Sequence, residues 1–411
     1  MSGRVGDLSP KQVEALEKLR EAVKDILTPS HDEHCLLRWL RAREFDVKKT
    51  ETMMRNDVVW RQQVGADTII EDWAVPEVVE KYYTGGLFGQ DKEGALLWID
   101  PFGHIDLKGI CRSVKKRDII KSKIHLLETI YRKFAQLTKE QGRPVDQITC
   151  LFDLENFGRR HLWKPGADLF CEMVELFEDH YPETQKTCFV INAPTIFPVV
   201  YNIVKPFLNE GTAKKVHVLG SNYKDVLKKY IDADQLPIHW GGTACDDNGD
   251  PKCSSKICFG GEVPESYYLK MQSSESLNFK EVLVKRGSTV QLDFDIKVAG
   301  SGLRWQFTTE GFDLGFGVYR RTENGVRQKA GDMEEVIPTQ RVNSHMVPED
   351  GFYTCTEPGV YVLRFDNTYS WARSKQVLYS VEVLVPDDTG ATKVWKEVGQ
   401  ADAAIVNGTD T

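Results

Sequence analysis

The sequence predicts a multidomain protein with an N-terminal helical region, an α/β domain and an all-β sandwich. The spacing of apolar residues, which changes twice along the chain, supports this prediction. Apolar residues first recur at helical spacing, then form short buried-strand runs between amphipathic stretches, and beyond about residue 274 they alternate with polar ones. We expect helices over 1–65, the α/β domain over 76–243, a linker over 244–273, the sandwich over 274–386 and a flexible tail over 387–411.

Three helices are expected in the N-terminal region. Ser9 can cap the first of them, with Pro10 at the first helical position and Gln12 three residues after the cap. The second covers about 32–43, and the third begins near Asp46, which is another candidate cap.

The α/β domain is expected to contain a largely parallel sheet, because short apolar runs alternate with helical stretches. The predicted strands are 95–99, 148–152, 188–191 and 216–219, and the predicted helices are 115–139, 164–180 and 196–208. Residues 243–260 are rich in Asp, Gly, Cys and Ser, which is typical of a turn-rich connector.

The C-terminal part is expected to form an antiparallel β-sandwich, because polar and apolar residues alternate between Gly and Asn turns. The predicted strands are 282–284, 290–296, 303–307, 360–365 and 377–385.

Composition and charge narrow the class of protein. The chain has 41% hydrophobic and 28% charged residues and a net charge of −8, which argues against a nucleic-acid partner. No apolar run approaches the ~20 residues of a membrane-spanning helix, and the N-terminus lacks the apolar core of a signal peptide. The nine cysteines are scattered, as reduced thiols are. We therefore expect a cytoplasmic protein.

The sequence carries no pattern typical of an enzyme or a metal site. Asp153 and Glu155 follow a predicted strand and would point the same way, as an acid/base pair does, but a carboxylate that caps the next helix is the commoner case. A zinc-protease motif, a nucleophile elbow and a phosphate-binding loop are all missing from the sequence. We expect a binding protein, with no catalytic residue, metal or cofactor.

An apolar segment that follows Pro194 and contains Pro206 is the main indication of function. It predicts a helix whose apolar face contains Ile196, Phe197, Val200, Tyr201, Val204, Phe207 and Leu208. This face could pack wholly inside the protein, or it could cover a bound hydrophobic molecule.

Two groups of basic residues accompany this segment. They are Lys115, Lys116, Arg117, Lys121 and Lys123, and Lys205, Lys214, Lys215, Lys224, Lys228 and Lys229. Such groups are commonly solvated faces, but a basic surface beside an apolar element also attracts an anionic bilayer. We expect transient contact with membrane surfaces through these basic patches.

Several motifs resemble, in order, those of the CRAL-TRIO lipid-transfer family. They are LLRWLRAREFDV (36–47), DKEGALLWID (91–100), HYPETQKTCFVINAP (180–194), KPFLNEGTAKKVHVLG (205–220) and LPIHWGGT (236–243). The later motifs GLRWQF, DLGFGVY, VPEDG and YVLRFDNTYSW resemble the GOLD domain, a β-sandwich module. The α/β domain is therefore identified as a CRAL-TRIO lipid-binding domain and the sandwich as a GOLD domain.

The resemblance implies a cavity between a sheet floor and a mobile gate helix at about 195–208, with hinges near Pro194 and Gly211. Trp98 and Leu151 match pocket positions that carry hydroxyl groups in phosphatidylcholine-binding members of the family. Their replacement favours a less polar ligand, such as tocopherol, squalene, a retinoid or another isoprenoid.

The resemblance also implies a phosphatidylinositol head-group site at Arg43, Glu183, Thr212 and Lys215. Two positions depart from the family pattern, because Glu44 replaces a lysine and Thr184 replaces an arginine. The expected function is lipid binding and transfer between membranes. The alternative is a lipid-sensing regulatory adaptor that binds a protein partner through its GOLD domain.

Overall fold

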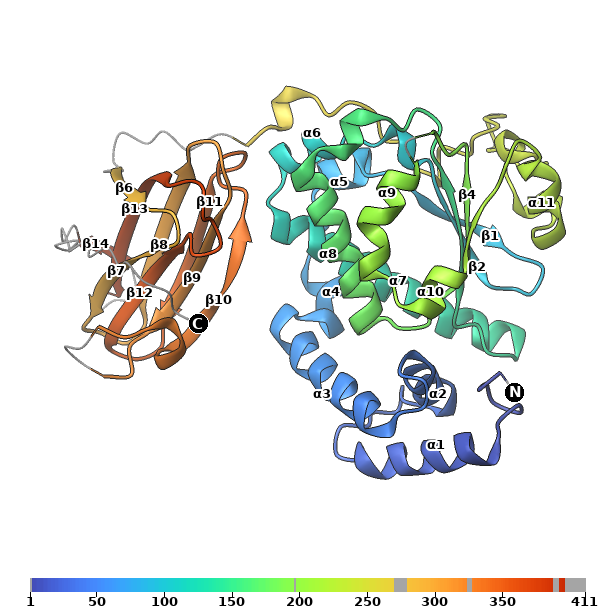
Figure 1. The fold of residues 1–411 in the computed structure, drawn as a ribbon, viewed down its shortest axis with the longest axis horizontal. Helices are drawn as coiled ribbons and strands as arrows, with labels where there is room; N and C mark the ends of the chain where they lie inside the picture. The colour runs from blue at the N-terminus through green and yellow to red at the C-terminus, as the bar shows by residue number, and fades with distance from the viewer. Residues whose placement is uncertain (1, 196, 270–278, 324–326, 387–391, 396–411) are drawn as a thin grey trace. The chain divides into compact units, whose positions relative to one another are not determined.

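The computed structural model describes residues 2–195, 197–269, 279–323, 327–386 and 392–395 (Figure 1). The chain forms two compact units. One runs up to Glu265 apart from residues 111–116, and the other consists of those six residues and the chain from Ser266 onward. The predicted fold class, which is helices, then an α/β domain, then a β-sandwich, is confirmed.

The N-terminal region consists of α1 (Pro10–Ala22), α2 (Glu33–Ala42) and α3 (Val47–Val64). Both predicted caps, Ser9 and Asp46, are present. The Ser9 Oγ accepts from the Gln12 amide at 3.2 Å, and the Gln12 side chain accepts in turn from the Ser9 amide at 2.8 Å. Asp32 and Asp46 cap α2 and α3. The helices share a buried core of Leu16, Leu19, Leu36, Leu37, Leu40 and Met54.

The α/β domain is built on a five-stranded sheet of order β1-β2-β3-β4-β5. The strands β2 (Leu96–Asp100), β3 (Ile148–Asp153), β4 (Gln185–Ile191) and β5 (Val216–Val218) are parallel, as expected. An unexpected strand, β1 (Gly86–Gln90), pairs antiparallel with β2. Two of its five residues are glycines, so it lacks the apolar alternation by which a strand is recognised.

Helices cover both faces of this sheet (Figure 1). The domain contains α4 (Ile69–Asp72), α5 (Glu77–Tyr82), α6 (Leu107–Ser113), α7 (Lys116–Gln141), α8 (Lys164–His180), α9 (Phe197–Val204), α10 (Glu210–Lys214) and α11 (Tyr223–Tyr230). On one face, sheet residues pack with Leu227 of α11. On the other, Ile130 and Phe134 of α7 pack against Leu96 and Ile148.

The connector after residue 243 differs from expectation. Cys253 and Ile257 are fully buried in the same cluster as Leu97 and Phe189 of the sheet. Residues 244–265 therefore belong to the α/β unit, whereas the sequence predicted a linker over 244–273. The high content of turn residues is real, but the two buried side chains fix the turns to the core.

The C-terminal unit is an antiparallel β-sandwich. One sheet has the order β10 (Glu334–Val342), β9 (Leu314–Arg320), β12 (Gly359–Asp366), β7 (Thr289–Ile296). The other contains β11 (Glu349–Cys355), β8 (Ser301–Thr309), β13 (Lys375–Pro386) and β14 (Thr392–Trp395), with β6 (Lys280–Val284) also on β13. Phe307, Phe316, Tyr361 and Phe365 lie in the core between the sheets. The strand β14 falls within the expected flexible tail, and the rest of 387–411 lies outside the described residues.

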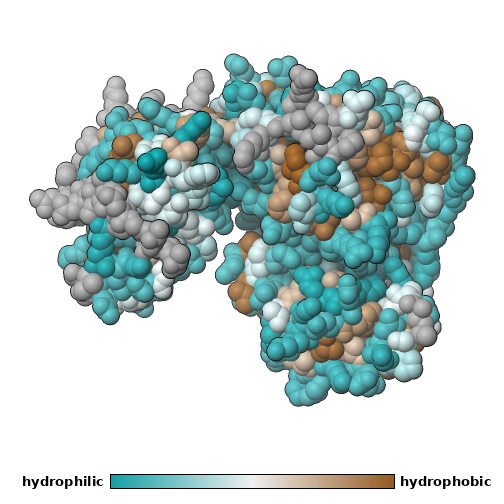
Figure 2. Space-filling model, viewed as in Figure 1, coloured by the Kyte–Doolittle hydropathy of each residue, from teal (hydrophilic) through white to brown (hydrophobic). Residues whose placement is uncertain are grey.

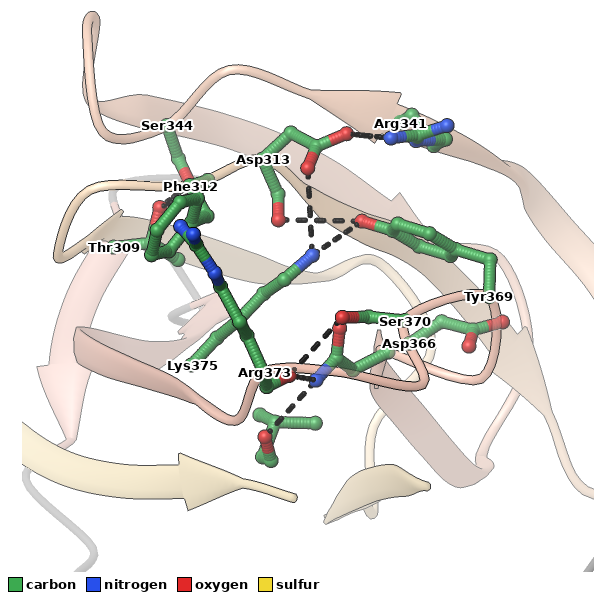
Figure 3. A network of polar contacts seen from close by, with 12 residues as sticks. Thr309, Phe312, Asp313, Arg341, Ser344, Asp366, Tyr369, Ser370, Arg373 and Lys375 are labelled. Atoms are coloured by element: carbon green, nitrogen blue, oxygen red, sulfur yellow. Dashed lines mark hydrogen bonds and ion pairs between the residues drawn. The ribbon is translucent and has the colours of Figure 1, made fainter. Parts of the chain in front are cut away.

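A polar network joins the loops at one end of the sandwich (Figure 3). The Lys375 Nζ, whose side chain is 3% exposed, donates to the Tyr369 hydroxyl at 2.8 Å and to Asp313 Oδ1 at 3.4 Å. The Arg341 Nε donates to the other oxygen of Asp313 at 2.7 Å. The Asn367 amide donates to the main-chain oxygens of Val284, Lys285 and Arg373. This network ties together the loops that carry these residues.

Candidate functional site

A cavity of about 340 Å³ lies between one face of the α/β sheet and the helices that cover it. Its walls are mostly apolar side chains. They include Leu126, Leu127 and Ile130 of α7, Phe170, Met173, Val174 and Phe177 of α8, and Phe102, Leu107, Leu154 and Phe157 from loops and short helices. A cavity of this size and lining suits a hydrophobic molecule.

The sheet supplies alternate residues to the cavity floor. Trp98 and Asp100 of β2, Cys150 and Phe152 of β3, and Val190 of β4 line it. Trp98 is therefore placed as expected. Leu151 is a correction, because it is fully buried on the opposite face with Ile99 and Phe189. Successive side chains of a strand point to opposite faces, so Cys150 and Phe152 occupy the pocket side instead.

The helix α9 and the turn after it form one wall of the cavity. Phe197, Tyr201, Val204 and Leu208 line it, as the apolar face predicted. The 3₁₀ turn Lys205–Phe207 follows α9, and Leu208 after it has extended backbone. This tighter turn takes Phe207 off the helical face, so that Phe207 is 38% exposed, which corrects the prediction that it lines the pocket. Ile196 and the side chain of Val200 lie outside the described residues.

Three of the four predicted head-group residues lie together at the cavity wall. Glu183, Thr212 and Lys215 all line it. The Lys215 Nζ donates to Glu183 Oε2 at 3.2 Å and to the main-chain oxygen of Gln185 at 2.9 Å. The Thr212 amide donates to Asn209 Oδ1 at 2.7 Å, which caps α10.

The fourth predicted residue, Arg43, lies elsewhere. Its Nη2 is 3.6 Å from Asp179 Oδ1, and its Nη1 donates to the neighbouring Ala42 oxygen. Arg41, which does not line the cavity, is the arginine that lies near Glu183, with its Nε 3.6 Å from Glu183 Oε2. The Nε and Nη2 atoms of Arg41 are buried and make no hydrogen bond. The helix α2 ends at Ala42, so only Arg41 projects from its last turn toward Glu183.

Thr184, which departs from the family pattern, supports the fold. It is buried, and its hydroxyl donates to the Tyr181 oxygen at 2.8 Å and lies 2.9 Å from the Tyr131 hydroxyl. The hydroxyl therefore ties β4 to α7 and to the end of α8.

The sequence prediction missed a pair of charged residues inside the cavity, Asp100 of β2 and Lys123 of α7. Both line it and both are buried, although Lys123 was expected in a basic surface patch. The Lys123 Nζ lies 3.1 Å from the centre of the Tyr83 ring. Burial lowers the pKa of Lys123 to about 7 and raises the pKa of Asp100. The helical spacing of Ile119, Lys123, Leu127 and Ile130 was a signal that could have placed Lys123 on the inner face.

The carboxylates of Asp153 and Glu155 and the His239 ring have ligand atoms within 4.8 Å of one another. Asp153 is occupied by structural bonds, however. Its Oδ1 accepts from Asn192 and from the Glu155 amide, and its Oδ2 accepts from the Trp240 indole at 2.9 Å. This cluster therefore anchors the ends of β3 and β4 to the Trp240 turn.

The chain matches two family models and is similar in sequence to known proteins. Residues 80–242 match the family model of the CRAL/TRIO domain, and residues 15–56 match that of the CRAL/TRIO N-terminal domain. The protein ctg-1 of Caenorhabditis elegans is 34% identical over 351 residues, which are 85% of this chain and 90% of that protein. A CRAL-TRIO domain-containing protein of the same nematode is 33% identical over 306 residues, 71% of this chain and 41% of its own length. The crystal structure of Sfh5 covers 62% of this chain and 93% of its own, with a TM-score of 0.49 and 16% identity.

Proposed function

Because this chain belongs to the CRAL/TRIO domain family, which binds and transfers lipophilic ligands, we propose that it carries one such ligand in the cavity beside α9 and exchanges it with membranes. The observation that carries the proposal is the apolar cavity, one wall of which is a short helix between proline-containing turns. We propose a carrier and not an enzyme, and we place it in the cytoplasm.

The cavity supplies the shelter that such a ligand needs. Each methylene group that leaves water contributes about 0.8 kcal/mol, so a ligand that buries about 15 of them gains about 12 kcal/mol. A bilayer offers a similar gain. Release therefore costs little free energy once the cavity opens at a membrane, and a movable wall makes exchange fast.

The gate segment, defined here as residues 197–208, has the surface chemistry of a membrane contact. Ile203 and Phe207 are 40% and 38% exposed, and the exposed Lys205 lies between them in the chain. Figure 2 shows hydrophobic surface among polar surface on the face where Figure 1 draws α9. No helix in the described part of the chain is long and apolar enough to cross a membrane. We propose that the gate segment inserts only into the bilayer surface.

The ligand itself is proposed from one polar corner of the cavity and from its apolar walls. The corner of Glu183 and Lys215 suits a phosphate, because Lys215 is held by a carboxylate that a phosphate could displace. Arg41 does not line the cavity, but it lies 3.6 Å from the same carboxylate. Phosphatidylinositol is therefore one candidate ligand. The apolar walls around Trp98 suit tocopherol, squalene or a retinoid.

The gate proposal is tested by the variant Phe207→Asp with Val59→Asp as its matched control. Val59 lies on α3 and is 53% exposed, so it receives the same charge away from the cavity. We expect Phe207→Asp to slow lipid transfer between vesicles by about tenfold or more, because it removes from the membrane contact an exposed phenyl ring that would enter the bilayer. Equal transfer rates for the two variants would remove the gate segment from the mechanism.

A second candidate function concerns the β-sandwich, whose sequence resembles a GOLD domain. Trp371 is 88% exposed on the loop between β12 and β13, and exposed tryptophans are typical anchors of protein contacts. We propose that the sandwich binds a protein partner, which would make the chain a lipid-sensing adaptor. Trp371→Ala should then abolish partner pull-down without changing lipid transfer. Slower lipid transfer in this variant would contradict a role of the sandwich that is separate from transfer.

A further inference from the structure

Two side-chain hydrogen bonds connect α8 with the gate segment and the residue that follows it. The helix α9 lies beside α8 (Figure 1), and the Cys171 thiol of α8 donates weakly to the Ile203 oxygen at 3.8 Å. Just after the gate segment, the Asn209 side chain donates to Glu178 Oε2 in the last turn of α8. In the described part of the chain, the gate segment makes no other side-chain hydrogen bond to the α/β unit. Its attachment therefore depends on apolar contacts and on these two bonds.

Asn209 uses both ends of its side-chain amide. Its Oδ1 accepts from the Thr212 amide at 2.7 Å and caps α10, while its Nδ2 donates to Glu178. Leu208 and Asn209 both have extended backbone, and they separate the 3₁₀ turn from α10. Hinges are commonly a few residues at the ends of elements that absorb a change in φ and ψ. One side chain therefore joins such a pair of residues to α8 and to α10.

Glu178 is held by neutral donors. It lines the cavity, and among the described residues it forms no ion pair, because Lys215 pairs with Glu183 instead. Burial raises the pKa of the Glu178 carboxyl, and the donors at Thr212 and Asn209 oppose this rise. A hydrogen bond to a carboxylate is about twice as strong as one between neutral groups. The bond from Asn209 can therefore hold the turn in place, and it can break without separating an ion pair.

We propose that Asn209 and Glu178 form a latch that holds the gate segment closed while the protein is away from a membrane. This inference rests on the proposed carrier function and specifies what regulates access to its cavity. A simple cap of α10 would need only the Asn209 Oδ1, so the Nδ2 bond to α8 serves a different purpose. When this bond breaks, the exposed Ile203 and Phe207 can move with the segment into a bilayer surface. The cap keeps the Asn209 side chain oriented, so the bond forms again on closing.

A native thiol can report on the opening of the gate. Cys171 is 5% exposed, does not line the cavity, and has its sulfur against the main chain of α9. A thiol reagent therefore reaches it when α9 moves away from α8. Two other cysteines of the same unit calibrate the measurement. Cys245 is exposed and reports the activity of the reagent, whereas Cys253 is fully buried beneath the sheet and reports unfolding of the unit.

The experiment measures the rate at which iodoacetamide alkylates Cys171 in the full chain, by mass spectrometry of its peptides. When closing is faster than alkylation, this rate follows the fraction of open molecules. Asn209→Ser keeps a residue that can cap α10 but removes the donor to Glu178. We expect it to raise the rate about tenfold, the effect of one hydrogen bond to a charged group.

Two further variants separate the latch from the cap. Asn209→Asp also keeps a capping residue, and its charge repels Glu178, so the Cys171 rate should rise above that of Asn209→Ser. Adding Glu178→Gln to Asn209→Asp should return the rate to within about threefold of the wild type, since glutamine can donate to the introduced carboxylate. The matched control is Glu175→Gln. Glu175 lies on the same helix and is exposed, so this variant should keep the wild-type rate.

The outcomes distinguish the latch from the carrier function. Equal Cys171 rates in the wild type, Asn209→Ser and Asn209→Asp overturn the latch but leave the carrier function standing. Faster alkylation of Cys253 together with Cys171 shows that a variant loosens the whole unit, which also overturns the latch. The expected rates in a protein that moves no lipid between vesicles support the latch and overturn the carrier function. Two different substitutions remove the Asn209 donor, so the proposal stays testable if one variant fails to fold.

Discussion

The Lys123 ammonium lies 3.1 Å from the centre of the Tyr83 ring, inside a cavity whose other walls are mostly apolar. The ring face is negative and attracts the cation, but it cannot replace the hydrogen bonds of water. The lysine is therefore held at a cost in stability. That cost depends on whether the amine is charged, and it can be measured.

Stability should rise with pH because of Lys123. Burial lowers its pKa to about 7, whereas in the unfolded chain it is near the ordinary 10.5. Between pH 7 and pH 10.5 the unfolded state binds more protons than the folded state. The free energy of unfolding therefore increases with pH, by about 2 to 4 kcal/mol over this range. Lys123→Met should lack this increase. Urea unfolding of both proteins at pH 7, 8, 9 and 10 measures the difference between their free energies of unfolding. This difference should change over that range and should be constant below pH 7. If the free energy of unfolding changed with pH in the same way in both proteins, a buried Lys123 with a lowered pKa would be contradicted.

Gly85→Ala should destabilise the α/β unit by about 2 to 4 kcal/mol, because the new methyl group would clash with Trp98. Gly261→Ala is the matched control. Gly261 has the same φ of +109°, but a Cβ there would meet nothing within 4 Å. Its cost should be only the backbone strain, about 1 kcal/mol. Denaturant unfolding of the two variants separates the clash from the strain, and equal losses would show that Trp98 moves aside freely.

Arg41→Gln and Lys215→Ala should each weaken phosphatidylinositol binding by about 10- to 100-fold, the range for hydrogen bonds to a charged group. Arg43→Gln should change it by less than about threefold, because Arg43 is paired with Asp179 away from the corner. Tocopherol binding should change little in all three variants. Vesicle-binding assays with the two lipids provide the measurement. Equal loss of both lipids would mean that these residues support only the fold.

Lys375→Met should destabilise the β-sandwich by about 1 to 3 kcal/mol, because it removes a buried donor from Asp313 and Tyr369. Burial opposes a low pKa for Asp313, but the Arg341 hydrogen bond and the Lys375 charge lower it overall. The stability that this network contributes should therefore be fully present above pH 3.8, the ordinary pKa of an aspartate. It should be lost as the pH falls from there through the lowered pKa of Asp313.

The control for this network is Lys297→Met. Lys297 pairs with Asp295 on the surface, with side chains 78% and 57% exposed. Its loss should change the free energy of unfolding by less than about 0.5 kcal/mol. If both lysine variants cost the same, the network of Figure 3 contributes no more than a surface pair.

Strong local signals made much of the fold predictable. The capping residues Ser9, Asp32 and Asp46 fix the start of each N-terminal helix through bonds to their own first turns. The helix α8 follows its predicted range because a long amphipathic pattern specifies it. The strands β1 and β9 escaped prediction because glycines at positions 86 and 89, and at 315 and 317, interrupt their alternation.

The site was predictable only in part, because its geometry depends on single-residue register. The strand β3 is covered on both faces, so its sequence does not reveal which of Cys150 and Leu151 faces the cavity. Which of Arg41 and Arg43 lies near Glu183 depends on where α2 ends. Helix propensity predicts such a boundary only to within a residue or two. Lys123 was missed because a lysine in a basic run is expected to face solvent. Its position on the helix instead places it on the inner face of α7.

The match to the CRAL/TRIO domain model stops at residue 242, yet Cys253 and Ile257 lie at zero exposure beneath the sheet. A fragment cut at that point would uncover Phe189 and Leu97, and its bare apolar surface would favour aggregation. The natural place to divide this protein, for recombination with other modules or for isolation of the carrier alone, therefore follows Glu265.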